Sequence, residues 1–230
     1  MKPVILLLAA TALVGAAPSR PSRASAPAPA PRYEAGGFEP FWTLVIEGGW
    51  LTFNPGTTEP VIRVRTPRRQ PTRNGYRYVV SRQLTIDVRH VRCDSYSSRT
   101  FADTVYVTGV AEGGCGGTPI APARLTATIW EMGALNGTPF RREDSNFLFA
   151  WDNVVRGSVG CSDFSVPFTE RRPFVQFGRM TVNRRDCGGL GSERERRVLE
   201  IFSGRSRISF VDGDTLILTG RHGTARLSPD

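Results

Sequence analysis

The chain has 230 residues, of which 40% are hydrophobic and 22% are charged. This balance is typical of a globular protein and excludes a disordered polymer, and the length allows one or two ordinary domains. The formal net charge of +9 falls to +6 without residues 1–26, which contain three basic residues and no acid. We expect no nucleic-acid partner, because such binding needs basic and aromatic residues interleaved on one face.

Residues 1–26 have the features of a secretory signal peptide. Lys2 precedes an apolar stretch that begins at Val4, and small residues follow to Ala17. A bacterial lipoprotein would carry a cysteine directly after this segment, whereas the first cysteine here is Cys93. No later stretch has the ~18 uninterrupted apolar residues of a membrane-spanning helix. We therefore expect a periplasmic or secreted protein with no transmembrane span, in which residues 27–32 form a Pro/Ala-rich tether.

The first predicted domain covers residues 33–117 and is a small β domain. Alternating apolar residues on either side of Gly48-Gly49 predict a β-hairpin. Loops are expected at 65–75 and 89–99, and the glycine-rich segment 113–117 closes the domain. Residues 118–123 contain two prolines and are predicted to form the linker at the domain boundary. The expected strands are 43–47, 50–53, 61–64, 76–80, 84–88 and 104–110.

The second predicted domain covers residues 124–230 and combines strands with one helix. Ser192 and Glu195 have the spacing of a capping box at a helix start, and Gly204 is a typical helix end. Between them Val198, Leu199 and Phe202 form an apolar stripe at helical spacing. The fold class is therefore mainly β (α+β), with two small antiparallel β domains. The strands expected in this half are 125–132, 147–151, 154–159, 174–177, 180–182, 208–211, 215–218 and 225–227.

Four cysteines allow three disulfide pairings, and their spacing alone cannot choose among them. One bridge within each domain, Cys93–Cys115 and Cys161–Cys187, is the economical assignment because each closes a loop of ~20–30 residues. Disulfides persist in oxidising compartments, which agrees with export.

Both halves resemble known bacterial families. The second contains Gly157-x-Val159-Gly160-Cys161-x-x-Phe164, which follows Trp130 and Asn136-Gly137 and precedes Asp212-Gly213, and it resembles the META domain of the HslJ-like envelope proteins. This resemblance implies a META-type β meander or barrel. It also implies a non-catalytic role in stress or antibiotic tolerance or envelope maintenance, through binding. The first half, with Glu39-Pro40-Phe41-Trp42 and its paired cysteines, resembles a small envelope and lipoprotein domain that brings no assigned chemistry.

The most basic segment of the chain suggests an alternative function. Its guanidinium groups could bind phosphate-bearing envelope polymers, or a partner protein, through bidentate contacts. A solvated surface loop is the other interpretation. The candidate anion-binding residues are Arg63, Arg65, Arg68, Arg69, Arg73 and Arg77.

The sequence gives little support for catalysis. His90 and His222 lie in no serine-elbow or metal motif, and such scattered cysteines lack the usual zinc-ligand pairs. The four candidate carboxylates stand beside cysteines and turns, where turn hydrogen bonds explain them: Asp94, Asp103, Asp163 and Asp186. The tryptophans are expected in core or hairpin packing: Trp42, Trp50, Trp130 and Trp151. We therefore expect no enzyme, metal or cofactor, with an unrecognised hydrolase as the alternative.

Overall fold

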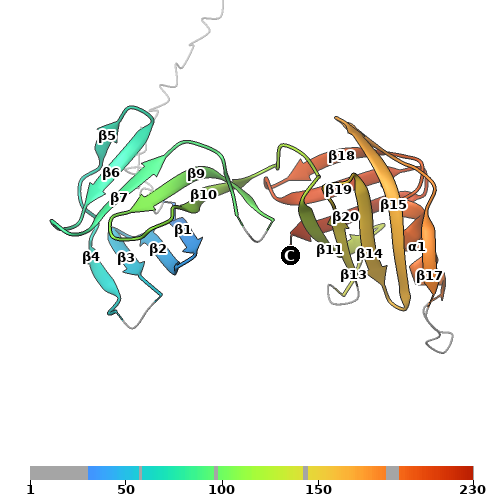
Figure 1. Ribbon diagram of the computed structural model, residues 1–230, viewed down its shortest axis with the longest axis horizontal. Coiled ribbons are helices and arrows are strands. Elements are labelled where there is room, and N and C mark those ends of the chain that lie inside the picture. The colour runs from blue at the N-terminus through green and yellow to red at the C-terminus, as the bar shows by residue number, and fades with distance from the viewer. Residues whose placement is uncertain (1–30, 57–58, 96–97, 142–144, 185–191, 230) are drawn as a thin grey trace, which may run out of the picture.

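The computed structural model describes residues 31–56, 59–95, 98–141, 145–184 and 192–229. The predicted signal peptide and most of the predicted tether lie outside these residues. The described chain forms two β units that follow one another along the sequence (Figure 1). Strands account for 60% of the described residues and helix for 5%, which confirms the mainly β fold class.

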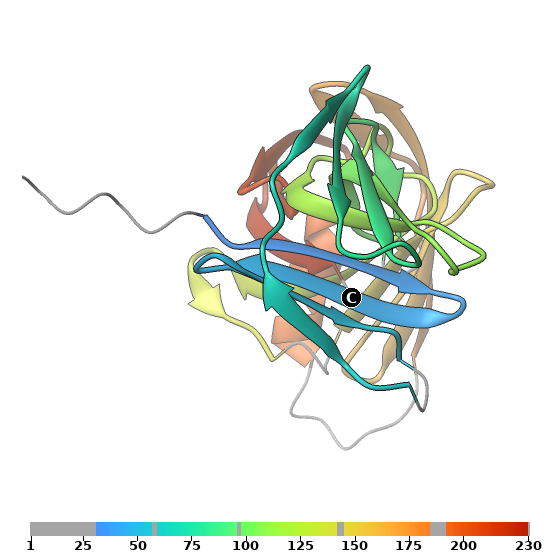
Figure 2. The same cartoon turned by 90° about the vertical axis from the view of Figure 1, so that its left-hand side faces the viewer.

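The first unit is an antiparallel sheet that curls into a half-barrel. Its strand order is β4-β3-β2-β1-β10-β9-β7-β6-β5, so β4 and β5 are the two edge strands of the described sheet. Figure 2 looks onto this unit and shows the segment between β4 and β5 joining the two halves of the curl. The strands are β1 (Tyr33–Phe38), β2 (Phe41–Glu47), β3 (Trp50–Asn54), β4 (Ile62–Arg65), β5 (Gln70–Thr72), β6 (Gly75–Val79), β7 (Thr85–Arg89), β8 (Cys93–Asp94), β9 (Thr100–Val107) and β10 (Gly114–Ile120).

The period-2 alternation of apolar residues builds the core of the half-barrel. In the β2–β3 hairpin Leu44 pairs with Phe53 and Ile46 with Leu51, and all four face the interior. Trp42 is 1% exposed at the start of the same inward row. The opposite half of the sheet completes this core with Tyr78, Leu84, Ile86, Val88, Val105 and Val107.

The second unit is an eight-stranded antiparallel barrel. Its ring closes because β11 pairs with both β13 and β20, while β12 and β17 pair with β11 and β15 outside the ring. Its elements are β11 (Thr128–Leu135), β12 (Thr138–Pro139), β13 (Ser145–Phe149), β14 (Val154–Val159), β15 (Ser162–Arg171), β16 (Phe174–Phe177), β17 (Thr181–Arg184), α1 (Ser192–Ile201), β18 (Arg205–Val211), β19 (Thr215–Gly220) and β20 (Gly223–Pro229).

An aromatic cluster around Phe202 forms the centre of the barrel core. Phe202 follows α1 directly and is fully buried, together with Val198 of the predicted helical stripe. Leu199, the third residue of that stripe, is only partly buried. The Phe202 ring centroid lies 4.7 to 6.5 Å from those of Phe147, Phe149, Phe164 and Phe177. The helix therefore packs its apolar face onto the barrel, as amphipathic helices do.

The two units have separate hydrophobic cores. Between the units, Arg99 Nε lies 3.8 Å from Asp214 Oδ2, and Arg172 Nη2 of the barrel donates at 2.6 Å to the carbonyl oxygen of Pro122, in the segment that joins β10 to β11. Gly213, at the tip of the β18–β19 hairpin, packs directly against the Pro119 backbone. A Cβ atom there would overlap the Pro119 carbonyl oxygen, so this contact needs glycine.

Most predicted strands are present within a few residues of the expected bounds, but several elements were missed or misplaced. The predicted loop 65–75 contains β5, and the segment expected to close the first domain is β10, which continues to Ile120 through half of the predicted linker. The longest strand, β15, was not predicted. Trp42 and Trp130 are buried as expected, whereas Trp151 is 82% exposed in the β13–β14 turn, so its predicted packing role is wrong.

The predicted disulfide between Cys93 and Cys115 is confirmed and links β8 to β10. Cys161 is also disulfide-bonded, while Cys187 lies outside the described residues. No helix in the described part of the chain is long and apolar enough to span a membrane.

Candidate functional site

The Asn136-Gly137 turn brings the β11–β12 hairpin against its neighbour. Both residues have positive φ, 51° and 79°, as a two-residue hairpin turn of this type requires. The Asn136 side-chain oxygen accepts a hydrogen bond from the Thr224 backbone N–H at 2.7 Å. Asn136 therefore joins the β11–β12 hairpin to the β19–β20 hairpin, which is a structural role.

The Gly157–Phe164 motif forms the β14–β15 hairpin, with Val159 opposite Ser162 and a turn at Gly160-Cys161. A Cβ atom at Gly157 would lie 2.7 Å from Phe147 Cδ1 and 2.8 Å from Phe164 Cε1. Glycine at this position therefore leaves room for the aromatic core that includes Phe164.

Glu195 of α1 attaches the helix to this hairpin. Its Oε1 accepts from the Cys161 N–H at 2.6 Å and its Oε2 from Ser162 Oγ at 3.3 Å. Gly160 has a φ of 52°, and a Cβ atom there would collide with the Glu195 carboxylate. From the sequence, Glu195 was predicted only as part of a capping box. Its hydrogen bonds to the distant Cys161 turn were not predicted.

Trp130 is buried in the barrel at 1% exposure, and its Nε1 donates to Thr128 Oγ1 at 2.6 Å. Buried indole N–H groups usually find such a partner. The predicted motif residues of the second unit thus build the fold, and a ligand site must be sought beside them.

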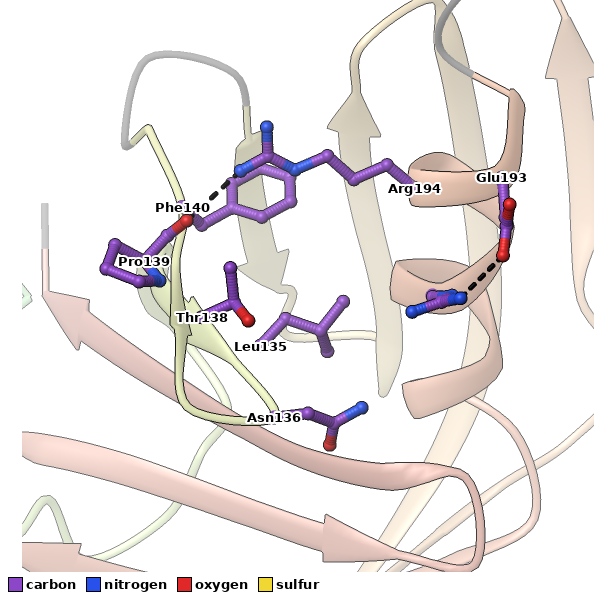
Figure 3. A pocket seen from close by; sticks show the side chains of 8 residues that line it. Leu135, Asn136, Thr138, Pro139, Phe140, Glu193 and Arg194 are labelled. Atoms are coloured by element: carbon purple, nitrogen blue, oxygen red, sulfur yellow. Dashed lines mark hydrogen bonds and ion pairs between the residues drawn. The ribbon is translucent and has the colours of Figure 1, made fainter.

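A pocket of about 430 Å³ lies between the β11–β12 hairpin and α1 (Figure 3). Leu135 and Phe140 form its apolar side, and each is only 8% exposed. Its volume is within the range of small-molecule sites. The lining residues are Leu135, Asn136, Thr138, Pro139, Phe140, Glu193, Arg194 and Arg197.

Two arginines of α1 form the charged rim of this pocket. Arg194 extends across the opening to the hairpin, where its guanidinium carbon lies 4.0 Å from the Phe140 ring centroid and Nη2 donates to the Pro139 carbonyl oxygen at 3.2 Å (Figure 3). Arg197 Nη2 donates to Glu193 Oε1 at 2.5 Å. This hydrogen bond lowers the pKa of the Glu193 carboxyl, which therefore stays ionised at neutral pH.

The arginines predicted to bind anions have different environments in the first unit. Arg63 and Arg65 are exposed on β4, with guanidinium carbons 5.0 and 4.3 Å from the Trp50 ring centroid. Stacking of this kind holds a guanidinium in place without using its N–H donors. These two side chains therefore form a preorganised cationic pair on the outer face.

Two other predicted anion-binding residues have protein partners. Arg69 Nε donates to the Tyr78 hydroxyl at 2.8 Å, and Arg77 forms a bidentate pair with Asp87 at 2.6 and 2.8 Å. Arg68 and Arg73 are exposed. Two of the six arginines are thus bonded to protein partners, and Arg63 with Arg65 is the best-defined part of the set.

A polar cluster that was not predicted links His90 to Asp103 in the first unit. Asp103 is 6% exposed, its Oδ1 lies 2.8 Å from His90 Nδ1, and its Oδ2 accepts from the Tyr33 hydroxyl at 3.2 Å. Burial, and next the Asp103 charge, raise the pKa of Tyr33, while burial and the adjacent Tyr78 raise the pKa of Tyr76 to about 12. Both tyrosines are thus neutral at ordinary pH. Sequence reasoning could not pair His90 with Asp103, because the two belong to no local motif.

Within the described residues, no three His, Cys, Asp or Glu side chains are grouped so that they could hold a metal ion. The fold and the pocket of the described residues define the class of the protein. It is a disulfide-containing protein of two β units, and the second unit is a barrel that carries one helix and a pocket with arginines at its rim.

Residues 123–228 match the family model of the META domain, which agrees with the resemblance of this half. No curated protein matches the chain. Among solved structures, the chain is similar to a protein determined by NMR, at 15% identity over 45% of this chain and 89% of that one, with a TM-score of 0.39. It is also similar to an NMR structure of a protein from Burkholderia xenovorans, at 16% identity over 46% of this chain and 83% of that one, with a TM-score of 0.37. The resemblance of residues 33–117 to an envelope domain stays a prediction.

Proposed function

We propose that the protein is an exported, non-catalytic envelope protein of the META type that acts by binding, in stress or antibiotic tolerance or in envelope maintenance. The pocket between the β11–β12 hairpin and α1 carries this proposal, because it combines a volume suited to a small molecule with an apolar side and a charged rim. The META match of residues 123–228 supports it. The Cys93–Cys115 disulfide supports export, since such bonds persist outside the reducing cytosol.

Deletion of the gene tests the role in the envelope. The deletion strain should become more sensitive to envelope stress and to antibiotics, and the full-length chain should restore resistance. A chain without residues 1–26 should not restore it if export is required. Unchanged sensitivity after deletion would contradict the proposal. Turnover of an ester, peptide or glycan by the purified protein would contradict the non-catalytic part.

A second candidate function is the binding of an anionic envelope polymer through Arg63 and Arg65. Their stacking on Trp50 keeps N–H donors available for phosphate oxygens, and this observation favours the candidate. Co-sedimentation with a teichoic acid tests it. The double variant Arg63→Ala/Arg65→Ala should lose binding that added salt also weakens.

Matched variants are available for this test. Arg205→Ala/Arg207→Ala removes two exposed arginines from the barrel, where Arg205 stacks on Phe174 in a similar way, and should leave binding intact. Arg68→Ala is a cleaner loop variant than Arg69→Ala, because Arg69 is bonded to Tyr78. An equal loss of polymer binding in the two double variants would contradict this candidate, because it would show that the polymer is attracted by positive charge anywhere on the protein.

A further inference from the structure

We propose that the pocket between the β11–β12 hairpin and α1 binds a small amphiphilic anion, which has an apolar body and a single carboxylate, sulfonate or phosphate group. This inference rests on the proposed binding function and names its ligand class. The apolar body would lie against Leu135 and Phe140, and Arg194 would receive the anionic group.

The charge balance of the rim selects an anion. The pocket is lined by two arginines and one glutamate, and the ionised Glu193 is paired with Arg197. Arg194 forms no ion pair with any described carboxylate, and it contacts the hairpin through a neutral carbonyl oxygen and an aromatic ring. Among the described residues, therefore, no carboxylate neutralises Arg194, and it keeps N–H donors at the opening besides the one bonded to Pro139. A guanidinium with free donors is a favourable partner for carboxylate or phosphate oxygens.

The pocket wall selects an amphiphile over a hydrophilic anion. Leu135 and Phe140 belong to the barrel core and show only a small apolar area to the pocket, which water covers in the free protein. A ligand with an apolar body would displace this water and gain the free energy of apolar burial, about 25 cal/mol per Å². An inorganic anion has no apolar body and would leave the apolar surface of Leu135 and Phe140 in contact with water.

The hairpin edge excludes an extended peptide as the ligand. A peptide that adds to a sheet needs a run of free backbone donors and acceptors along the edge strand. The edge strand here, β12, consists of Thr138 and Pro139, and proline has no N–H donor. Two residues with one donor cannot hold an added strand, so side-chain contacts with a small molecule remain.

Anilinonaphthalene sulfonate is a suitable probe, because it joins an aromatic body to one sulfonate and fluoresces when bound. Titration of the full-length chain should give one saturable site, from which dodecanoate displaces the probe and dodecyltrimethylammonium does not. Arg194→Ala should weaken binding about 10-fold or more, the effect expected from the loss of one charge-assisted hydrogen bond. Thr138→Trp should block the pocket while the circular dichroism spectrum stays unchanged.

Arg196→Ala is the matched control, since it removes an exposed arginine of the same helix that does not line the pocket. Equal weakening by Arg196→Ala and Arg194→Ala would overturn the proposal, and so would equal displacement by the cationic and anionic detergents. Phe41→Ala tests a second apolar pocket, which Phe38 and Phe41 line in the first unit. A probe signal that is lost in Phe41→Ala and kept in Arg194→Ala would also overturn the proposal.

This inference can fail separately from the proposed function. Full restoration of resistance by Arg194→Ala in the deletion strain would leave the envelope role standing and reject the amphiphilic ligand. Specific probe binding that needs Arg194, in a strain without a deletion phenotype, would keep the site and reject the envelope role.

Discussion

The carboxylate of Glu195 fixes α1 to the hairpin that carries Cys161. Both of its oxygens accept hydrogen bonds from that turn, one from a backbone N–H and one from a hydroxyl. Gly160 provides the space that the carboxylate occupies. One acidic side chain therefore connects two segments that lie 34 residues apart.

Removal of this carboxylate should destabilise the barrel. We expect Glu195→Ala to lower the free energy of unfolding by about 1–3 kcal/mol, because the Cys161 N–H loses its acceptor. Glu195→Gln keeps one acceptor oxygen and should cost less. Urea unfolding followed by circular dichroism measures both. Glu193→Ala is the control, with a change of less than about 0.5 kcal/mol, since Glu193 is exposed. Equal stability of the two alanine variants would contradict the role of Glu195.

The tyrosines near Asp103 should make the first unit sensitive to alkali. A tyrosine in an unfolded chain loses its proton near pH 10. In the folded state burial raises the pKa of Tyr76 to about 12, so the folded chain binds the proton more tightly. This contribution to stability is complete below pH 10 and should disappear between about pH 10 and 12. Unfolding measured at a series of pH values should show the decline.

Tyr76→Phe should flatten this decline, because phenylalanine has no proton to lose. Tyr106→Phe, at an exposed tyrosine, is the matched control and should leave it in place. A decline that is equally steep in Tyr76→Phe would refute the assignment.

At the scale of elements, α1 and Phe202 complete the barrel core. We expect Phe202→Ala to lower the free energy of unfolding by about 3–5 kcal/mol, because it leaves a cavity among four other aromatic rings. Thermal unfolding of the full chain would show this loss. Trp151→Ala removes an even larger side chain that is 82% exposed, and should change the stability by no more than about 0.5 kcal/mol. A small loss for Phe202→Ala would mean that the helix contributes little to the core.

The elements predicted correctly are those whose own residues carry a pattern. The β2–β3 hairpin has alternation around Gly48-Gly49, and α1 has helical spacing between a cap and Gly204. In contrast, β10 is rich in glycine, and its place depends on pairing with β1 and β9. The missed β15 contains Pro167, which ordinarily argues against a central strand. Here Pro167 faces outward where β14 begins and accepts a hydrogen bond from the Gly178 N–H through its carbonyl oxygen.

The candidate site was less predictable than the fold. The turn at Asn136-Gly137 follows from its two residues alone. The pocket beside it needs Phe140 and Arg194, which are distant in sequence and meet only because the closed barrel brings the hairpin next to α1. The His90–Asp103 pair has the same origin, since His90 directly follows β7 and Asp103 lies on β9, which pairs with β7.

At the scale of the whole molecule, the separate cores should let the two units respond independently to loss of the first disulfide. We expect Cys93→Ala/Cys115→Ala to destabilise the first unit by about 3 kcal/mol, because the bridge closes a loop of 22 residues in the unfolded chain. The barrel transition should stay where it is, since the barrel has a hydrophobic core of its own. Thermal unfolding followed with two spectroscopic probes, one for each unit, would resolve the two transitions. A parallel shift of both transitions would show that the units unfold as one body.

The unequal closure of the two sheets has a consequence for solubility. The barrel forms a complete ring, whereas the half-barrel leaves β4 and β5 as edges, and an open edge strand is a place where another copy of the chain can add. Arg63 and Arg65 on one edge and Pro71 on the other are the residue types that discourage such addition, by repulsion and by the missing donor. We therefore expect neutralisation of Arg63 and Arg65 to drive the chain toward oligomers that begin at the first unit.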